Sequence, residues 1–227
     1  MGDAYFVGHV HGRLIAFDLD GTLIESRRDL ADSANDLIVE LGGSPLSVEA
    51  VAGMVGEGAR VLVSRALAAA GLGDGPWALP RFLEIYDTRL LNHTRLFPGA
   101  ADMLLAARRG ARVAVLTNKP IGPTEKILAG LGVRDLFDDV IGGDGPYPRK
   151  PDPASLRALM EGAGTNAATT LMVGDSRIDL ATARGASVRC CIVTHGFGFR
   201  PEAIEGADWI VDDVRGVADA IEQFCIP

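Results

Sequence analysis

Short apolar runs alternate with amphipathic stretches along most of the chain. Five stretches have the periodicity of helices with one buried face, at residues 100–109, 124–131, 154–160, 179–186 and 214–224. Six apolar runs have the length of buried strands, at residues 14–17, 113–116, 140–141, 170–173, 190–193 and 209–211. The alternation predicts an α/β fold, a Rossmann-like doubly wound parallel sheet with helices on both faces.

The stretch from 24 to 96 breaks this alternation because it shows helical periodicity without a convincing buried strand. Joints rich in glycine and proline separate four expected helices, at 29–41, 48–54, 59–70 and 78–92. We interpret 24–96 as a helical cap domain inserted into an α/β core domain made of 1–23 and 97–227. Because the insertion leaves and re-enters the core near strand ends, we expect it to act as a lid over them.

The composition is that of an ordinary globular protein and narrows the range of partners. The chain has 227 residues, of which 48% are hydrophobic, and no apolar run approaches the roughly 20 residues of a membrane helix. With no signal-peptide pattern at the start, we expect a cytoplasmic protein without a membrane partner. The formal net charge of -8 argues against nucleic acid as a partner. The cysteines lack zinc or disulfide spacing, so we expect buried free thiols.

Two carboxylates stand two residues apart at the end of the first apolar run. Asp18 and Asp20 face the same side of an extended backbone, so they repel each other unless a cation or a proton lies between them. Gly21 then lets the chain turn at the carboxyl end of the strand, where open parallel sheets bind ligands. Taken alone, this segment is also consistent with a hydrophilic turn after an edge strand.

Three later strand ends carry polar groups as well. Thr117 and Asn118 precede a helix whose first amides could bind phosphate oxygens, although a simple helix cap explains them equally well. Lys150 lies in a proline-rich loop. The sequence is consistent with a fixed positive charge that faces an anionic group and also with an ordinary surface lysine. Asp175 and Asp179 follow the run at 170–173. Acidic groups gathered at one sheet edge, with oxygen ligands only, indicate Mg²⁺ rather than zinc.

These motifs together resemble those of the haloacid dehalogenase superfamily. Its four signatures correspond here to Asp-Leu-Asp-Gly-Thr at 18–22, Thr117, Lys150 and the Gly-Asp to Asp segment at 174–179. The resemblance spans nearly the whole chain, including a helical cap between the first and second motifs. Shorter matches at 55–60, 141–144, 149–153 and 173–176 look like phosphoglycolate phosphatases. Glu25 departs from this group, many of whose members have Asp there.

The resemblance implies a Mg²⁺-dependent phosphomonoester hydrolase whose substrate is a small phosphate ester, with 2-phosphoglycolate as the leading candidate. Asp18 would attack phosphorus and form an aspartyl-phosphate, and Asp20 would serve as general acid and then general base. Asp18, the backbone carbonyl of Asp20 and Asp175 would hold the metal, with Thr22 and Asp179 in support.

The phosphoryl oxygens would be held by Thr117, by the backbone around Asn118 and by Lys150, which thereby takes part in catalysis. In the cap, Glu57 and Arg60 are candidates for contacts with the rest of the substrate, and a solvated helix start explains them equally well. A monomer and a homodimer are both consistent with the sequence.

Other functions remain open at this point. A sugar phosphomutase, or a pyrophosphatase or nucleotidase of the same superfamily, would keep the same aspartates. A dehalogenase has no use for Asp20, and a phosphonate hydrolase would need a cap lysine, whereas 24–96 contains none. Outside enzymology, the alternative is a catalytically silent binding module.

Overall fold

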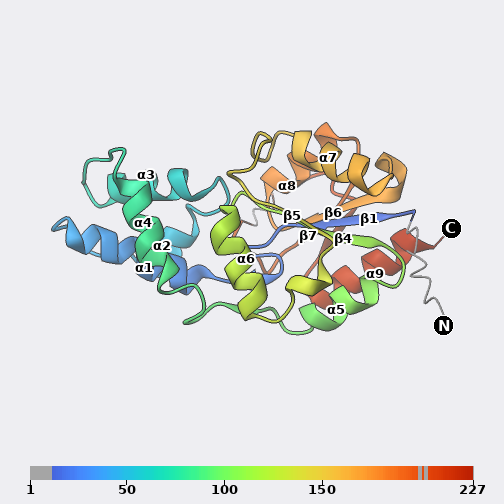
Figure 1. Ribbon diagram of the computed structural model, residues 1–227, viewed down its shortest axis with the longest axis horizontal. Helices are drawn as coiled ribbons and strands as arrows, with labels where there is room; N and C mark the ends of the chain where they lie inside the picture. The colour runs from blue at the N-terminus through green and yellow to red at the C-terminus, as the bar shows by residue number, and fades with distance from the viewer. Residues whose placement is uncertain (1–11, 199–200, 202–203, 227) are drawn as a thin grey trace, which may run out of the picture.

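A central parallel sheet organises the computed structural model, which describes residues 12–198, 201 and 204–226 (Figure 1). Its strand order is β5-β4-β1-β6-β7-β8, and β1 pairs with β4 on one side and with β6 on the other. The α/β fold class predicted from the sequence is confirmed. The strands are β1 (Leu14–Phe17), β4 (Arg112–Leu116), β5 (Asp139–Ile141), β6 (Thr170–Gly174), β7 (Arg189–Val193) and β8 (Trp209–Val211).

Helices cover both faces of this sheet (Figure 1). Ile15 and Phe17 of β1 pack into the core cluster that contains side chains of α5, α6 and α9. Leu14 and Ala16 belong to the opposite cluster, with side chains of α7 and α8. Because both faces are buried, the strands read as continuous apolar runs in the sequence. The helices are α5 (Ala100–Ala107), α6 (Ile121–Gly130), α7 (Ala154–Ala163), α8 (Arg177–Gly185) and α9 (Val214–Cys225).

Helix ends account for most differences between the expected and the observed elements. Helix α6 begins at Ile121 rather than at 124, because a proline in the first turn, Pro123, lacks only an N–H that has no partner within the helix. Helix α7 continues to Ala163 and ends where Gly164 adopts a left-handed φ of 64°. Two short 3₁₀ helices, η1 (Arg134–Leu136) and η2 (Ala167–Thr169), were not expected. No helix in the described parts of the chain is long and apolar enough to cross a membrane.

The helices within residues 24–96 gather at one end of the molecule, beyond the sheet (Figure 1). The expectation that 24–96 contains helices only was wrong, because two short strands pair in antiparallel fashion at its ends. Strands of two residues are too short to show a periodicity. The division into a core domain and a cap domain at 24 and 96 stays a prediction. The elements are β2 (Ile24–Glu25), α1 (Arg27–Glu40), α2 (Val48–Ala52), α3 (Ala59–Ala69), α4 (Ala78–Asp87) and β3 (Arg95–Leu96).

A buried carboxylate ties the two ends of this helical segment together. Asp29, in the first turn of α1, accepts hydrogen bonds from the backbone N–H groups of His93 and Thr94 and from the Thr94 hydroxyl. The shortest contacts are 2.8 Å, and both Asp29 and Thr94 are buried. The outgoing and returning segments are therefore held side by side near the β2–β3 pair.

Candidate active site

A chain of ion pairs lies at the carboxyl end of β1. The Asp18 backbone N–H donates to the Val173 carbonyl oxygen of β6 at 2.9 Å, which fixes Asp18 beside the neighbouring strand. Lys150 Nζ donates to Asp18 Oδ1 at 2.7 Å and to Asp179 Oδ1 at 2.6 Å. All three side chains are buried. Lys150 therefore holds the carboxylates of Asp18 and Asp179 in place. Removing Lys150 would leave their negative charges buried and uncompensated.

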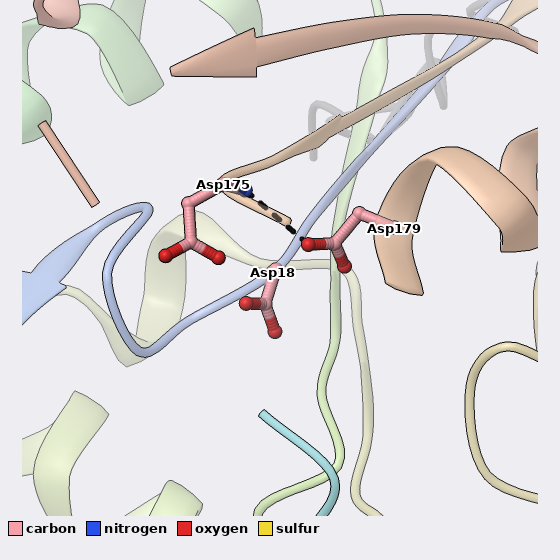
Figure 2. Close-up of side chains that lie close together, drawn as sticks. All are labelled: Asp18, Asp175 and Asp179. Carbon is pink, nitrogen blue, oxygen red and sulfur yellow. Dashed lines mark hydrogen bonds between the residues drawn. The ribbon is translucent and has the colours of Figure 1, made fainter. Parts of the chain in front are cut away.

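Asp175 adds a third carboxylate to this cluster (Figure 2). It follows β6, while Asp179 lies in the first turn of α8, so one turn brings both to the same edge of the sheet. One carboxylate oxygen from each of Asp18, Asp175 and Asp179 lies within 4.8 Å of the other two. Gly21 makes room for this arrangement, since its φ is +86° and a Cβ at that position would collide with Asp175 Oδ2.

The free oxygens of the cluster fit a hard divalent cation. Within the described residues, no hydrogen bond reaches Asp18 Oδ2 or Asp175 Oδ1. Asp179 differs, because Lys150 donates to its Oδ1 and the hydroxyl of Ser176 donates to its Oδ2 at 2.7 Å. Carboxylate oxygens suit Mg²⁺. Asp18 and Asp175 could therefore hold the ion, and Asp179 could position its neighbours.

Burial and crowding of like charges dominate the electrostatics here. Burial raises the pKa of Asp18 to about 6, against the opposing charge of Lys150. Burial also raises the pKa of Asp175 well above its usual range, and the negative charge of Asp179 adds to that rise. Burial acts to lower the pKa of Lys150, but the charges of Asp179 and Asp18 outweigh it and leave that pKa above its ordinary value. A bound divalent cation would favour the ionised carboxylates.

Asp20 contacts a lysine that the sequence analysis did not single out. Lys119 Nζ lies 3.0 Å from Asp20 Oδ1 and 2.9 Å from Asp20 Oδ2, and the Ser26 hydroxyl donates to Oδ1 at 2.5 Å. The Lys119 ammonium also lies 4.8 Å from the centre of the Tyr86 ring. One signal could have identified it, since it is one of three lysines in the chain and directly follows a predicted phosphate-binding pair.

Thr117 and Thr22 are both buried near the ends of their strands. Thr117 lines the same cavity as Asp18, and its hydroxyl oxygen accepts a hydrogen bond from the Lys119 backbone N–H at 3.2 Å. The Thr22 hydroxyl makes no hydrogen bond to any described residue. The predicted roles of these two threonines stay predictions.

Asn118 links the two parts of the molecule through its side chain. Its amide nitrogen donates to the Gly56 carbonyl oxygen, between α2 and α3, and to the Lys150 carbonyl oxygen, both at 2.9 Å. The amide oxygen is buried and accepts no hydrogen bond from the described residues. The side chain thus connects the helical segment to the loop that carries Lys150, and only the Asn118 backbone is left for the predicted phosphate contact.

A small cavity lies between the carboxylates of Asp18 and Asp20 and the helical segment. Its volume is about 40 Å³, and its walls include Asp18, Asp20, Thr117 and Lys119. The opposite wall belongs to helices α1, α3 and α4 and to the loop before α3, with apolar side chains such as Leu30, Leu62 and Phe82.

The two cap residues predicted to contact substrate lie outside this cavity wall. Arg60 Nη1 contacts Asp74 Oδ1 at 3.5 Å and the Gly75 carbonyl oxygen at 3.3 Å. Glu57 Oε1 accepts from Arg65 at 2.8 Å and lies 3.8 Å from Arg177 of the core helix α8. Each is therefore engaged by another charged residue at the surface.

Comparison with known proteins identifies the family. The sequence model of the haloacid dehalogenase-like hydrolase family matches residues 15–193, which include all four predicted motifs. The chain belongs to the haloacid dehalogenase-like hydrolase family. The resemblance predicted from the motifs is confirmed.

Similar members of this hydrolase family have one name in common. A phosphoglycolate phosphatase from Rhodospirillum rubrum is 44% identical over 216 residues, covering 91% of this chain and 90% of the relative. Phosphoglycolate phosphatase 1 from Pseudomonas aeruginosa is 38% identical over 220 residues, with 93% and 80% covered. The crystal structure of a predicted phosphoglycolate phosphatase from Haemophilus somnus 129PT superposes with a TM-score of 0.86 at 32% identity, covering 94% of this chain and 99% of that one. This chain is thus a hydrolase similar to phosphoglycolate phosphatases.

Proposed function

We propose that this family member is a Mg²⁺-dependent phosphomonoester phosphatase that hydrolyses 2-phosphoglycolate through an aspartyl-phosphate on Asp18. The observation that carries the proposal is the position of Asp18, a buried carboxylate at the cavity wall with Lys150 on one oxygen and the other oxygen free of hydrogen bonds from the described residues. The choice of 2-phosphoglycolate as the substrate rests on the names of the relatives.

The first half of the reaction transfers the phosphoryl group to the protein. A carboxylate oxygen of Asp18 forms a bond to phosphorus while the bond between phosphorus and the ester oxygen breaks. Asp20 lies at the wall of the same cavity and donates a proton to the departing alkoxide. In this proposal Thr117 and backbone N–H groups after β4 bind the phosphoryl oxygens. Lys150 holds the Asp18 carboxylate in position.

The second half returns Asp18 to its starting state. Asp20 takes a proton from a water molecule as that water attacks phosphorus, and the bond between phosphorus and Asp18 breaks, which releases inorganic phosphate. Mg²⁺ held by Asp18 and Asp175, with the Asp20 carbonyl as the predicted third ligand, would neutralise charge on the phosphoryl oxygens. Residues 24–96 act as a cap domain in this proposal, closing over the ester and opening for water.

The test is phosphate release from a panel of small phosphate esters, with Mg²⁺ and after chelation. We expect turnover with metal only, and the highest kcat/KM for 2-phosphoglycolate. Equal rates with and without metal would remove the metal from the mechanism. Transfer of phosphate between positions of a sugar, without release, would instead indicate a phosphomutase.

A matched pair of variants tests the nucleophile. Asp18→Asn is nearly isosteric, so it should abolish phosphate release while the circular dichroism spectrum stays that of the wild type. Asp102→Asn changes an exposed carboxylate on α5 and should retain full activity. Phosphate release by a folded Asp18→Asn protein would contradict the assignment.

A further inference from the structure

The cavity next to Asp18 and Asp20 admits only a small leaving group. Its volume of about 40 Å³ is far below the roughly 300–1,000 Å³ of pockets that bind drug-sized ligands. Most of its wall is apolar, with Leu30, Leu62 and Phe82 among the residues on the helical side. The polar groups in this wall therefore determine which small group is accepted.

Lys119 is the one basic side chain among the described residues that line this cavity. It is buried, and its ammonium group lies between the Asp20 carboxylate and the face of the Tyr86 ring. An ammonium group has three N–H donors. The two oxygens of Asp20 account for two of them, which leaves one donor for the Tyr86 hydroxyl oxygen or for an acceptor in the cavity.

Tyr86 supplies a second donor that the structure leaves without a partner. The residue is 2% exposed and lines the same cavity, and its hydroxyl, which lies beside the Lys119 ammonium, donates its hydrogen to no described residue. A lysine that served only to neutralise Asp20 would not require this hydroxyl. A buried hydroxyl without a partner is costly, which indicates that a ligand completes it.

We propose that Lys119 and Tyr86 are specificity-determining residues, which together bind a carboxylate on the leaving group of the substrate. This inference rests on the proposed phosphatase function. Two donors, one of them a cation, fit the two oxygens of a carboxylate better than they fit a neutral hydroxyl group.

The position of Lys119 also defines the length of the leaving group. In the proposed mechanism Asp20 faces the ester oxygen, and Lys119 is hydrogen-bonded directly to Asp20. A carboxylate that is separated from the ester oxygen by a single methylene group comes within reach of Lys119. A second methylene would have to fit into the same small cavity, so 3-phosphooxypropanoate should be a poorer substrate than 2-phosphoglycolate.

The experiment compares 2-phosphoglycolate with 2-hydroxyethyl phosphate, an ester of the same length without the carboxylate. Lys119→Met should lower the ratio of their kcat/KM values by roughly 10- to 100-fold, the range expected for a hydrogen bond to a charged group. Tyr86→Phe removes one oxygen atom and should lower the ratio by a factor of about 3 to 10. Lys126→Met, which removes an exposed lysine on α6, should leave the ratio unchanged.

The outcomes separate this inference from the proposed function. A wild-type protein that releases phosphate from neither ester overturns the proposed function. A wild-type protein that is active but does not prefer 2-phosphoglycolate overturns the carboxylate subsite and the choice of substrate, and leaves the proposed phosphatase activity standing. Equal losses on both esters in Lys119→Met and in Tyr86→Phe would assign these residues to Asp20 and to packing, and would also overturn the subsite. If Lys119→Met does not fold, Lys119→Arg, which keeps the charge, and Tyr86→Phe take its place. A lower ratio of kcat/KM values in either variant supports the subsite, and an unchanged ratio in both overturns it.

Discussion

The side-chain amide of Asn118 donates a hydrogen bond of 2.9 Å to the carbonyl oxygen of Gly56. This contact joins the end of strand β4 to the loop before helix α3, across 62 residues of sequence. The same amide nitrogen donates to the Lys150 carbonyl oxygen, so one side chain connects the helical segment and the loop that carries the proposed catalytic lysine.

Asn118→Ala should weaken closure of the helical segment over the substrate. The change removes two hydrogen bonds and leaves the Gly56 carbonyl without this donor, and we expect KM for 2-phosphoglycolate to rise about tenfold. Steady-state kinetics would measure the change. Asn166→Ala removes a capping side chain from η2, far from the site, and should lower stability slightly without changing KM. An unchanged KM in Asn118→Ala would show that the contact does not contribute to closure.

Asp29→Ala should destabilise the fold. The buried N–H and hydroxyl of Thr94 would lose their acceptor, at a cost of about 2–3 kcal/mol in the free energy of unfolding. Urea denaturation would measure this cost. Asp32→Ala is a suitable control, since its partner Arg28 is a solvent-exposed residue and such pairs contribute little. Similar unfolding midpoints for the two variants would contradict a structural role for Asp29.

Mg²⁺ should stabilise the protein through Asp175. A ligand that binds only the folded state raises its stability, and a concentration 100 times the Kd corresponds to about 2.7 kcal/mol, or a rise of roughly 5–10 °C in Tm for a chain of this size. Asp175→Asn should largely abolish this Mg²⁺-dependent rise in thermal unfolding experiments, while Asp102→Asn should retain it. A full rise in the Asp175→Asn protein would exclude this carboxylate as a ligand.

The thiol reactivity of the native protein should come from one cysteine. Burial raises the pKa of Cys191 to about 12 and that of Cys190 well above its ordinary value, so neither forms appreciable thiolate between pH 7 and 9. Cys225 is only partly buried, contrary to the expectation that all three cysteines are buried. A disulfide reagent should modify at most one thiol per native chain, at a rate that rises with pH, and three after unfolding. Rapid reaction of two thiols in the folded protein would contradict this prediction.

Local sequence patterns were sufficient for the sheet and for the carboxylate cluster. Strands that are buried on both faces are apolar throughout, and the strand ends of a parallel sheet meet at one edge. Asp18, Asp175 and Asp179 could therefore be assigned to one place from their positions after β1 and β6, and the structure gathers their oxygens within 4.8 Å. The β2–β3 pair could not be predicted, because two residues carry no periodicity.

The sequence by itself determined the order of the elements, the family and the carboxylates, because each motif that identifies them consists of residues close together along the chain. Only the tertiary structure decided which side chains complete the site. Lys119 meets Asp20 across 99 residues, and Tyr86 comes to the same cavity from a helix whose other buried residues are apolar. Such contacts depend on how the helical segment packs against the sheet edge, and no local spacing in the sequence specifies that packing.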